Sequence, residues 1–261
     1  MNPLRPRTHS FLILLLLMGL LFSGGCAWFA MGPPSPPFDR QEIAAIVSAF
    51  ENQEKAVHSL FSTGTFTLET QGAQSEAEVL IVARRDPPSI RIEITHPWGQ
   101  PLLHIQVNGS RLNVISFSEK RHYRGRLGTP WILKQIPFPL DPDLIWSLAR
   151  AYPVLPSYHH AQSMKDNQMT LMDERDADIQ VIDLYPDRHP RRVRLCRQGT
   201  VIAFSDFQDL SGILYAGKIQ VTDGENTTLL TLDIRQMVFN RELPEGIFRQ
   251  EPPPGFEAVD L

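Results

Sequence analysis

Hydrophobic and polar residues alternate with a period of two along most of the chain after residue 61. The clearest case is Ser89–Thr95, where Ile90, Ile92 and Ile94 fall on one face and polar or charged residues on the other. In Gly64–Thr70, Phe66 and Leu68 alternate with threonines. Similar runs predict further strands at 76–84, 102–107, 111–117, 168–173, 178–185, 191–197, 201–207, 216–223 and 227–239, roughly eleven strands in all, and 121–125 is a candidate for one more short strand.

Two segments show helical spacing instead. The first follows Asp39, a candidate N-cap with Glu42 three residues later, and has an apolar stripe that begins at Ile43 and Ile46. The second spans about 141–150, where Pro142 follows Asp141 and suits a helix start. Leu144, Ile145 and Leu148 lie on one side of this second helix, and proline-rich segments flank it.

The order of these elements predicts a mainly β (α+β) fold. Consecutive hairpins indicate an antiparallel sheet, and no βαβ rhythm favours a parallel one. Asn108-Gly109, between two of the strands, is typical of a type I′ hairpin turn. A sheet this wide must curl toward a barrel or expose its edges.

The N-terminus predicts the compartment. Arg5 and Arg7 precede the apolar run Phe11–Phe22, which has the length of a signal-peptide core and is short for a membrane span. The segment "LFSGGC" then resembles a bacterial lipobox, although Ser23 stands where leucine is more usual. The resemblance implies that residues 1–25 are a cleaved signal and that Cys26 is acylated. Residues 26–38 would form a proline-rich linker, and residues 39–261 one folded domain.

Composition and motifs favour no catalytic class. Formal net charge is −4, which argues against a nucleic-acid partner. The sequence holds no nucleophile elbow, zinc-protease motif, phosphate loop or Cys-x-x-Cys. His159 and His160 are adjacent on a strand and would point to opposite faces, a poor metal site. Cys196 lies in a strand-like segment, and we expect its thiol to have a packed, structural role. We expect neither a bound metal nor a cofactor.

The basic cluster Asp187–Arg194 has two interpretations. Alternate residues of one strand can face solvent while Val193 and Leu195 face the core, which we favour. The alternative is a contact with anionic lipid head groups.

Three longer segments carry a family resemblance. "ARRDPPSIRIEI" (Ala83–Ile94), "THPWGQPLLHIQVNGSRLNV" (Thr95–Val114) and "IPFPLDPDLIWSLARAYP" (Ile136–Pro153) are similar to segments of the LolA/LolB family. That family comprises the periplasmic carrier and the outer-membrane receptor of lipoprotein sorting. The C-terminal "LPEGIFRQEPPPGFEAVDL" is more like the carrier. The resemblance covers about residues 39–261 and implies a half-open antiparallel β-barrel with an N-terminal helix and a mid-chain helical lid.

The resemblance also implies a site. The family's barrel encloses an apolar cavity for acyl chains, which here would be lined by Phe66, Leu68, Ile90, Ile92, Ile94, Leu144, Ile145 and Leu148. Trp98 occupies the position at which the receptor displays a protruding leucine. Trp98 is therefore a candidate membrane-contacting residue, and the alternative is that it folds back onto the barrel.

Three functions follow, in order of preference. The first is a monomeric, non-enzymatic lipoprotein, anchored in the outer membrane through Cys26 and facing the periplasm. It would bind phospholipid or lipoprotein acyl chains, with a periplasmic lipoprotein carrier as a partner. The second is an assembly or structural envelope lipoprotein that uses the same barrel to bind a protein. The third is a hydrolase with an unrecognised site.

Overall fold

A computed structural model describes residues 36–70, 73–129, 141–224 and 227–261. Residues from Pro37 to Leu261 form one compact unit. The described residues of this unit include the helices α2 (Arg40–Lys55) and α4 (Pro142–Arg150). The strands are β1 (Ser59–Thr70), β2 (Ala73–Arg84), β3 (Ser89–Thr95), β4 (Pro101–Asn108), β5 (Arg111–Ser116), β6 (Arg121–Arg126), β7 (His160–Gln162), β8 (Gln168–Met172), β9 (Asp178–Leu184), β10 (Pro190–Leu195), β11 (Thr200–Leu210), β12 (Ile213–Thr222), β13 (Thr228–Phe239) and β14 (Glu257–Asp260).

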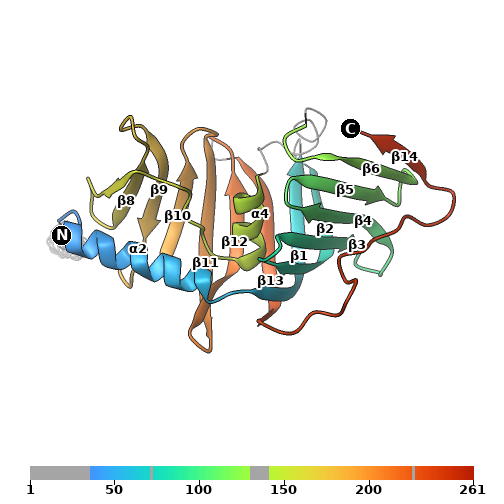
Figure 1. Cartoon of the computed structure of the whole chain (residues 1–261), viewed down its shortest axis with the longest axis horizontal. Helices are drawn as coiled ribbons and strands as arrows, with labels where there is room; N and C mark the ends of the chain where they lie inside the picture. Colours follow the sequence, from blue (N-terminus) through green and yellow to red (C-terminus); the bar gives the residue numbers. More distant parts are fainter. Residues whose placement is uncertain (1–35, 71–72, 130–140, 225–226) are drawn as a thin grey trace, which may run out of the picture. The chain divides into compact units, whose positions relative to one another are not determined.

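All of these strands belong to one open sheet. Its order is β14-β6-β5-β4-β3-β2-β1-β13-β12-β11-β10-β9-β8-β7, so β14 and β7 are the two edges. Strand direction turns along the sheet, and β3–β6 run across the direction of β8–β11 (Figure 1). The prediction of a mainly antiparallel β fold is confirmed, and the sheet does not close on itself.

The predicted count of about eleven strands is wrong, because the described sheet has fourteen. Two of the additional strands are very short, namely β7 and β14. β14 pairs with β6 in parallel, with Val259 opposite Tyr123, so the sheet is not purely antiparallel. This pairing joins strands more than a hundred residues apart, which local alternation does not reveal.

Both helices begin where their capping residues predict. The Asp39 side chain accepts from the Glu42 backbone N–H at 2.8 Å, and the Glu42 carboxylate accepts from the Asp39 N–H at 3.0 Å. Asp141 caps α4 by accepting from Leu144 N at 2.7 Å. Ala151 then ends α4 in the left-handed region, with φ 58°.

The face of the sheet that α2 and α4 cover is called the inner face. Strand register places the predicted apolar residues there: Phe66 lies opposite Ala77, Ile92 opposite Ile81, and Ile94 opposite Val79. Together with the apolar residues of both helices they form one core cluster. Figure 1 shows the two helices on this side of the sheet.

The opposite, outer face of β2–β5 is covered by the chain that follows β13. Arg91 Nη1 donates to the carbonyl oxygen of Ile247 at 2.7 Å, and the Gln106 amide donates to that of Phe248. Val82 and Ile115 are each 2% exposed on this face. The C-terminal segment therefore shields apolar surface that an open sheet would otherwise present to solvent.

One predicted turn differs in register. The two-residue loop between β4 and β5 is Gly109-Ser110, and of the two only Gly109 has a positive φ, 57°. A type I′ turn requires positive φ at both loop residues, so the type I′ prediction is wrong.

Candidate functional site

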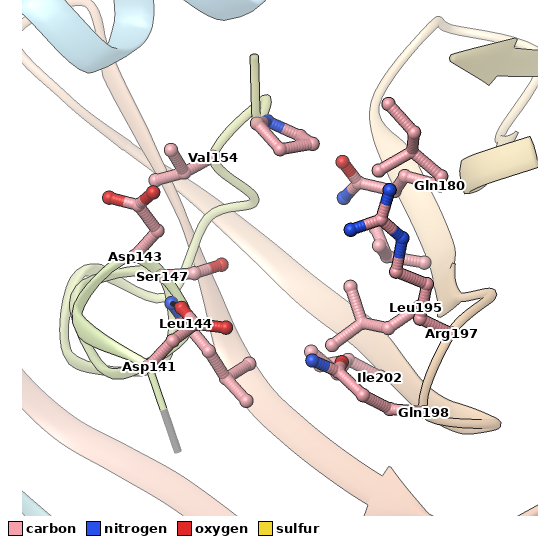
Figure 2. A pocket seen from close by; sticks show the side chains of 13 residues that line it. Asp141, Asp143, Leu144, Ser147, Val154, Gln180, Leu195, Arg197, Gln198 and Ile202 are labelled. Carbon is pink, nitrogen blue, oxygen red and sulfur yellow. Dashed lines mark hydrogen bonds between the residues drawn. The ribbon is translucent and has the colours of Figure 1, made fainter. Parts of the chain in front are cut away.

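A pocket of about 200 Å³ lies between α4 and the inner face. On one side are α4 and the segment that follows it, and on the other are β9, β10 and β11 (Figure 2). The residues that line it are Asp141, Asp143, Leu144, Ser147, Val154, Pro156, Ile179, Gln180, Val193, Leu195, Arg197, Gln198 and Ile202. Figure 2 shows the α4 side chains facing those of the sheet across an open space.

The lining is mixed, because seven of its thirteen residues are apolar and the other six are polar or charged. Leu144 projects from α4 toward Ile202 and Leu195 (Figure 2). Asp143, at the first turn of α4, is opposed across the pocket by Arg197 of the β10–β11 turn (Figure 2). Asp143 stays exposed to solvent, but partial desolvation of its carboxyl raises the pKa, and the nearby Asp141 raises it further. This arrangement suits a ligand with an apolar body and a polar end.

Gln180 is the one fully buried polar side chain that reaches this pocket from β9. It is 2% exposed and lies on the inner face, opposite Leu195 of β10 and Leu171 of β8. Its Oε1 has no hydrogen-bond partner within the described part of the chain. In Figure 2 the amide points from the strand toward the space beside α4.

Few polar contacts hold α4 against the sheet and α2. Ala216 N of β12 donates to Ala151 O at 2.8 Å. Arg150 donates to the backbone carbonyl of Gln53 in α2, and its guanidinium lies 4.6 Å from the Tyr152 ring. Burial lowers the pKa of Arg150 to about 10. Arg150 also donates to the side-chain oxygen of Gln53 at 3.3 Å, and the Arg85 guanidinium lies 5.7 Å from the Trp146 ring of α4. The buried face of α4 adds apolar packing.

A second pocket of about 620 Å³ lies where β1 begins and β2 ends. It is lined by His58, Ser59, Arg84, Arg85, Asp86, Pro88, Arg241 and Leu243. Although this pocket is larger, half of its lining residues are charged, and none of them comes from α4 or from the predicted cavity set. The pocket beside α4 is therefore the better candidate for an apolar ligand.

The predicted cavity residues do not form a single site. Leu144 lines the pocket, whereas Ile145 and Leu148 pack into the surrounding core. Phe66, Leu68, Ile90, Ile92 and Ile94 lie on the inner face of β1 and β3 and do not line the pocket. The physical reason is that the pocket lies on the side of α4 that faces β9–β11.

Trp98 is 73% exposed, so it does not fold back into the core. It lies in the turn between β3 and β4, where Gly99 N donates to His96 O at 2.7 Å and Gly99 has φ 87°. The Trp98 ring stacks on that of His96. The predicted lipidation site, Cys26, lies outside the described residues.

The predicted cavity set contains none of the residues on the pocket's sheet side, among them Ile179, Gln180 and Ile202. One signal was available for Gln180, since it occupies an inward position in the otherwise apolar alternation with Ile182 and Leu184. Val193, predicted to face the core, is 1% exposed.

Two features are absent from the described residues. No helix in them is long and apolar enough to cross a membrane. No group of three or more His, Cys, Asp or Glu side chains in them is placed to hold a metal ion.

Comparison with known proteins defines the fold. No family model matches the sequence, and no curated protein sequence matches it. A LolA-superfamily protein from Nitrosomonas europaea aligns with a TM-score of 0.52 and 15% identity, over 78% of this chain and 97% of that one. A DUF1329-family protein from Desulfovibrio piger aligns with a TM-score of 0.48 and 10% identity, over 79% and 97%. The lipoprotein LppX of Mycobacterium tuberculosis aligns with a TM-score of 0.33 and 12% identity, over 79% and 99%. The first of these shows that the chain has a LolA-like fold.

Proposed function

We propose that this protein is a non-enzymatic envelope lipoprotein that binds lipid, or the acyl chains of lipoproteins, between α4 and the inner face. Cys26, acylated, would anchor it in the outer membrane, where it would take part in lipoprotein localisation. The observation that carries the proposal is the apolar pocket beside a helix with few polar attachments. The LolA-like fold supports it.

The energetics favour an apolar ligand at this position. Each Å² of apolar surface removed from water contributes about 25 cal/mol, and no directional partner is needed. The pocket of about 200 Å³ is smaller than the roughly 300–1,000 Å³ of typical small-molecule sites. A whole lipid would therefore require α4 to move away from β9–β11, as lids do when ligands enter.

The test is lipid analysis of the purified full chain carrying Cys26→Ser, which cannot be acylated. We expect extracted phospholipid or acylated peptide to be detected by mass spectrometry. Leu195→Phe, which fills the pocket, should reduce the amount, and Leu80→Phe, on the outer face of β2, should not. Thermal unfolding of each variant checks that the fold is retained. Absence of lipid from the folded Cys26→Ser chain would contradict the proposal.

A second function has one observation in its favour. The small pocket and the packed core around it fit an open sheet that serves as a scaffold for a protein partner. A folded, lipid-free protein whose interior stays closed to added fatty acid would support this alternative over the first.

A further inference from the structure

We infer that Gln180 selects ligands whose polar end carries a hydrogen-bond donor, an amide N–H or a hydroxyl, over ligands whose polar end only accepts. The inference rests on the proposed function, because it assigns the polar contact within the same pocket. The site chemistry is a carbonyl oxygen that faces an apolar cavity and has no partner in the described chain.

Gln180 is almost completely buried. A polar side chain that is 2% exposed has lost its water, and an unsatisfied buried acceptor costs stability. Its neighbours on the inner face, Leu195 and Leu171, are apolar and offer no donor. A leucine at position 180 would pack with these neighbours without that cost, so the glutamine suits a position at which a hydrogen-bond donor reaches Oε1.

The pocket has room for part of a ligand beside Gln180. Gln180 projects from β9 toward the segment 154–156 (Figure 2), and the apolar Val193 and Ile202 line the same pocket. The volume of about 200 Å³ is several times the roughly 30 Å³ that one water occupies in the liquid. It has room for the polar end and first carbons of one chain, so the donor of that chain would meet Gln180 Oε1.

The rim charges do not supply the same selectivity. Asp143 and Arg197 lie at the charged edge of the pocket, and Arg197 is paired with Asp173 at 3.4 Å. Asp143 is exposed to solvent, where a hydrogen bond exchanges with water and discriminates little. Among the lining residues, Gln180 alone combines near-complete burial with an unpartnered acceptor in the described chain.

The experiment compares three probes that share one decanoyl chain. Decanamide presents N–H donors, monodecanoylglycerol presents hydroxyls, and methyl decanoate only accepts. Their dissociation constants are measured by calorimetry on the full chain carrying Cys26→Ser. We expect decanamide, monodecanoylglycerol or both to bind about tenfold more tightly than methyl decanoate, since one buried hydrogen bond supports a difference of this order.

Substitutions test whether Gln180 causes the preference for the donor probes. Gln180→Leu should abolish it by weakening the donor probes while leaving methyl decanoate bound as tightly or more tightly. Gln180→Met, which is closer in shape, serves if the leucine variant does not fold. Gln220→Leu, on the outer face of β12, should keep the wild-type preference.

The outcomes separate the two claims. Equal binding of all three probes, tighter binding of methyl decanoate, or a preference that survives Gln180→Leu overturns the role of Gln180 and leaves lipid binding intact. If the folded protein binds none of the probes, the proposed function fails and the inference fails with it. A preference for either donor probe, or for both, over methyl decanoate supports the inference. A preference for one donor probe alone also tells amide-bearing ligands from hydroxyl-bearing ones.

Discussion

Arg150 and Gln53 join the two helices that cover the inner face. The guanidinium of Arg150, 0% exposed at the last turn of α4, donates through Nη2 to the backbone carbonyl of Gln53 in α2. Nε and Nη1 of the same guanidinium have no partner in the described chain. The same Nη2 also lies 3.3 Å from Gln53 Oε1, so Arg150 ties α2 to the end of the helix that must move if a whole lipid enters.

We expect Arg150→Met to speed lipid uptake while changing the free energy of unfolding by no more than about 1 kcal/mol. The variant loses a charged hydrogen bond, but it also removes a buried, under-partnered charge, and these effects are of similar size. Uptake is measured by stopped-flow quenching with a fluorescent fatty acid, and stability by urea unfolding. Arg126→Met, on the exposed strand β6, is the matched control. Unchanged uptake in folded Arg150→Met would show that this contact does not restrain α4.

Trp98 supplies a second prediction, about the membrane. Because its side chain is 73% exposed, Trp98→Glu should leave thermal unfolding unchanged. If the indole inserts at the membrane interface, binding to phosphatidylethanolamine–phosphatidylglycerol vesicles should weaken by roughly tenfold, equivalent to about 1.4 kcal/mol. Co-sedimentation of the Cys26→Ser chain measures it.

Leu210→Glu is the control for Trp98→Glu. Leu210 is 40% exposed and lies in the β11–β12 hairpin, at the opposite strand ends from the β3–β4 turn. Equal vesicle binding by Trp98→Glu and the parent chain would exclude a membrane role for the indole. An equal loss in both variants would point to a nonspecific effect of the added charge.

Local patterns predicted the elements well because their causes are local. Asp39 and Asp141 supply caps within three residues of the N–H groups they accept from, and the alternation in β3 follows from the pleat of one strand. The same reasoning could not reveal β14, whose pairing with β6 depends on where the chain returns.

The candidate site was predicted only in part, for a related reason. Periodicity placed Leu144 and Phe66 on apolar faces, but it does not say which apolar residues touch and which leave a gap. The side of α4 that faces a gap is set by the loop path and by contacts such as Ala216 N to Ala151 O. A polar residue at an inward strand position, as at Gln180, was the available sequence signal.

Gly64 tests the close approach of β1 and β13. A Cβ added at Gly64 would lie 2.2 Å from the carbonyl oxygen of Asp233, which is backbone and cannot rotate away. We expect Gly64→Ala to destabilise the fold by roughly 3 kcal/mol or more, since one of the two strands must shift.

Gly99→Ala is the contrast for Gly64→Ala. Nothing lies within 4 Å of the added Cβ at Gly99, and its φ of 87° alone opposes the change. A cost of about 1 kcal/mol is expected from this backbone strain. Urea unfolding measures both variants. A smaller loss for Gly64→Ala than for Gly99→Ala would show that β1 and β13 are farther apart than in the structure.

His104 predicts that the contact between the sheet and the C-terminal segment weakens at low pH. Burial lowers the pKa of His104, the nearby Glu93 partly opposes this, and Arg91 lowers it further. The His104 ring lies 4.7 Å from that of Phe117, which in turn contacts Phe256 of the C-terminal segment at 5.6 Å. Since the folded-state pKa is below the ordinary 6.5, the unfolded chain takes up the proton first as pH falls.

The neutral His104 therefore stabilises the fold in full above pH 6.5. This stabilisation is lost as the pH falls through the lower, folded-state pKa. We expect His104→Leu to reduce the drop in melting temperature between pH 7 and pH 5. His159→Leu, at an exposed position, should retain the full drop. Proteolysis near residues 240–256 should increase on acidification in the parent chain and less so in His104→Leu, because the protonated imidazole loosens the contact with Phe117. Equal pH profiles for the parent and His104→Leu would assign the acid sensitivity to other groups.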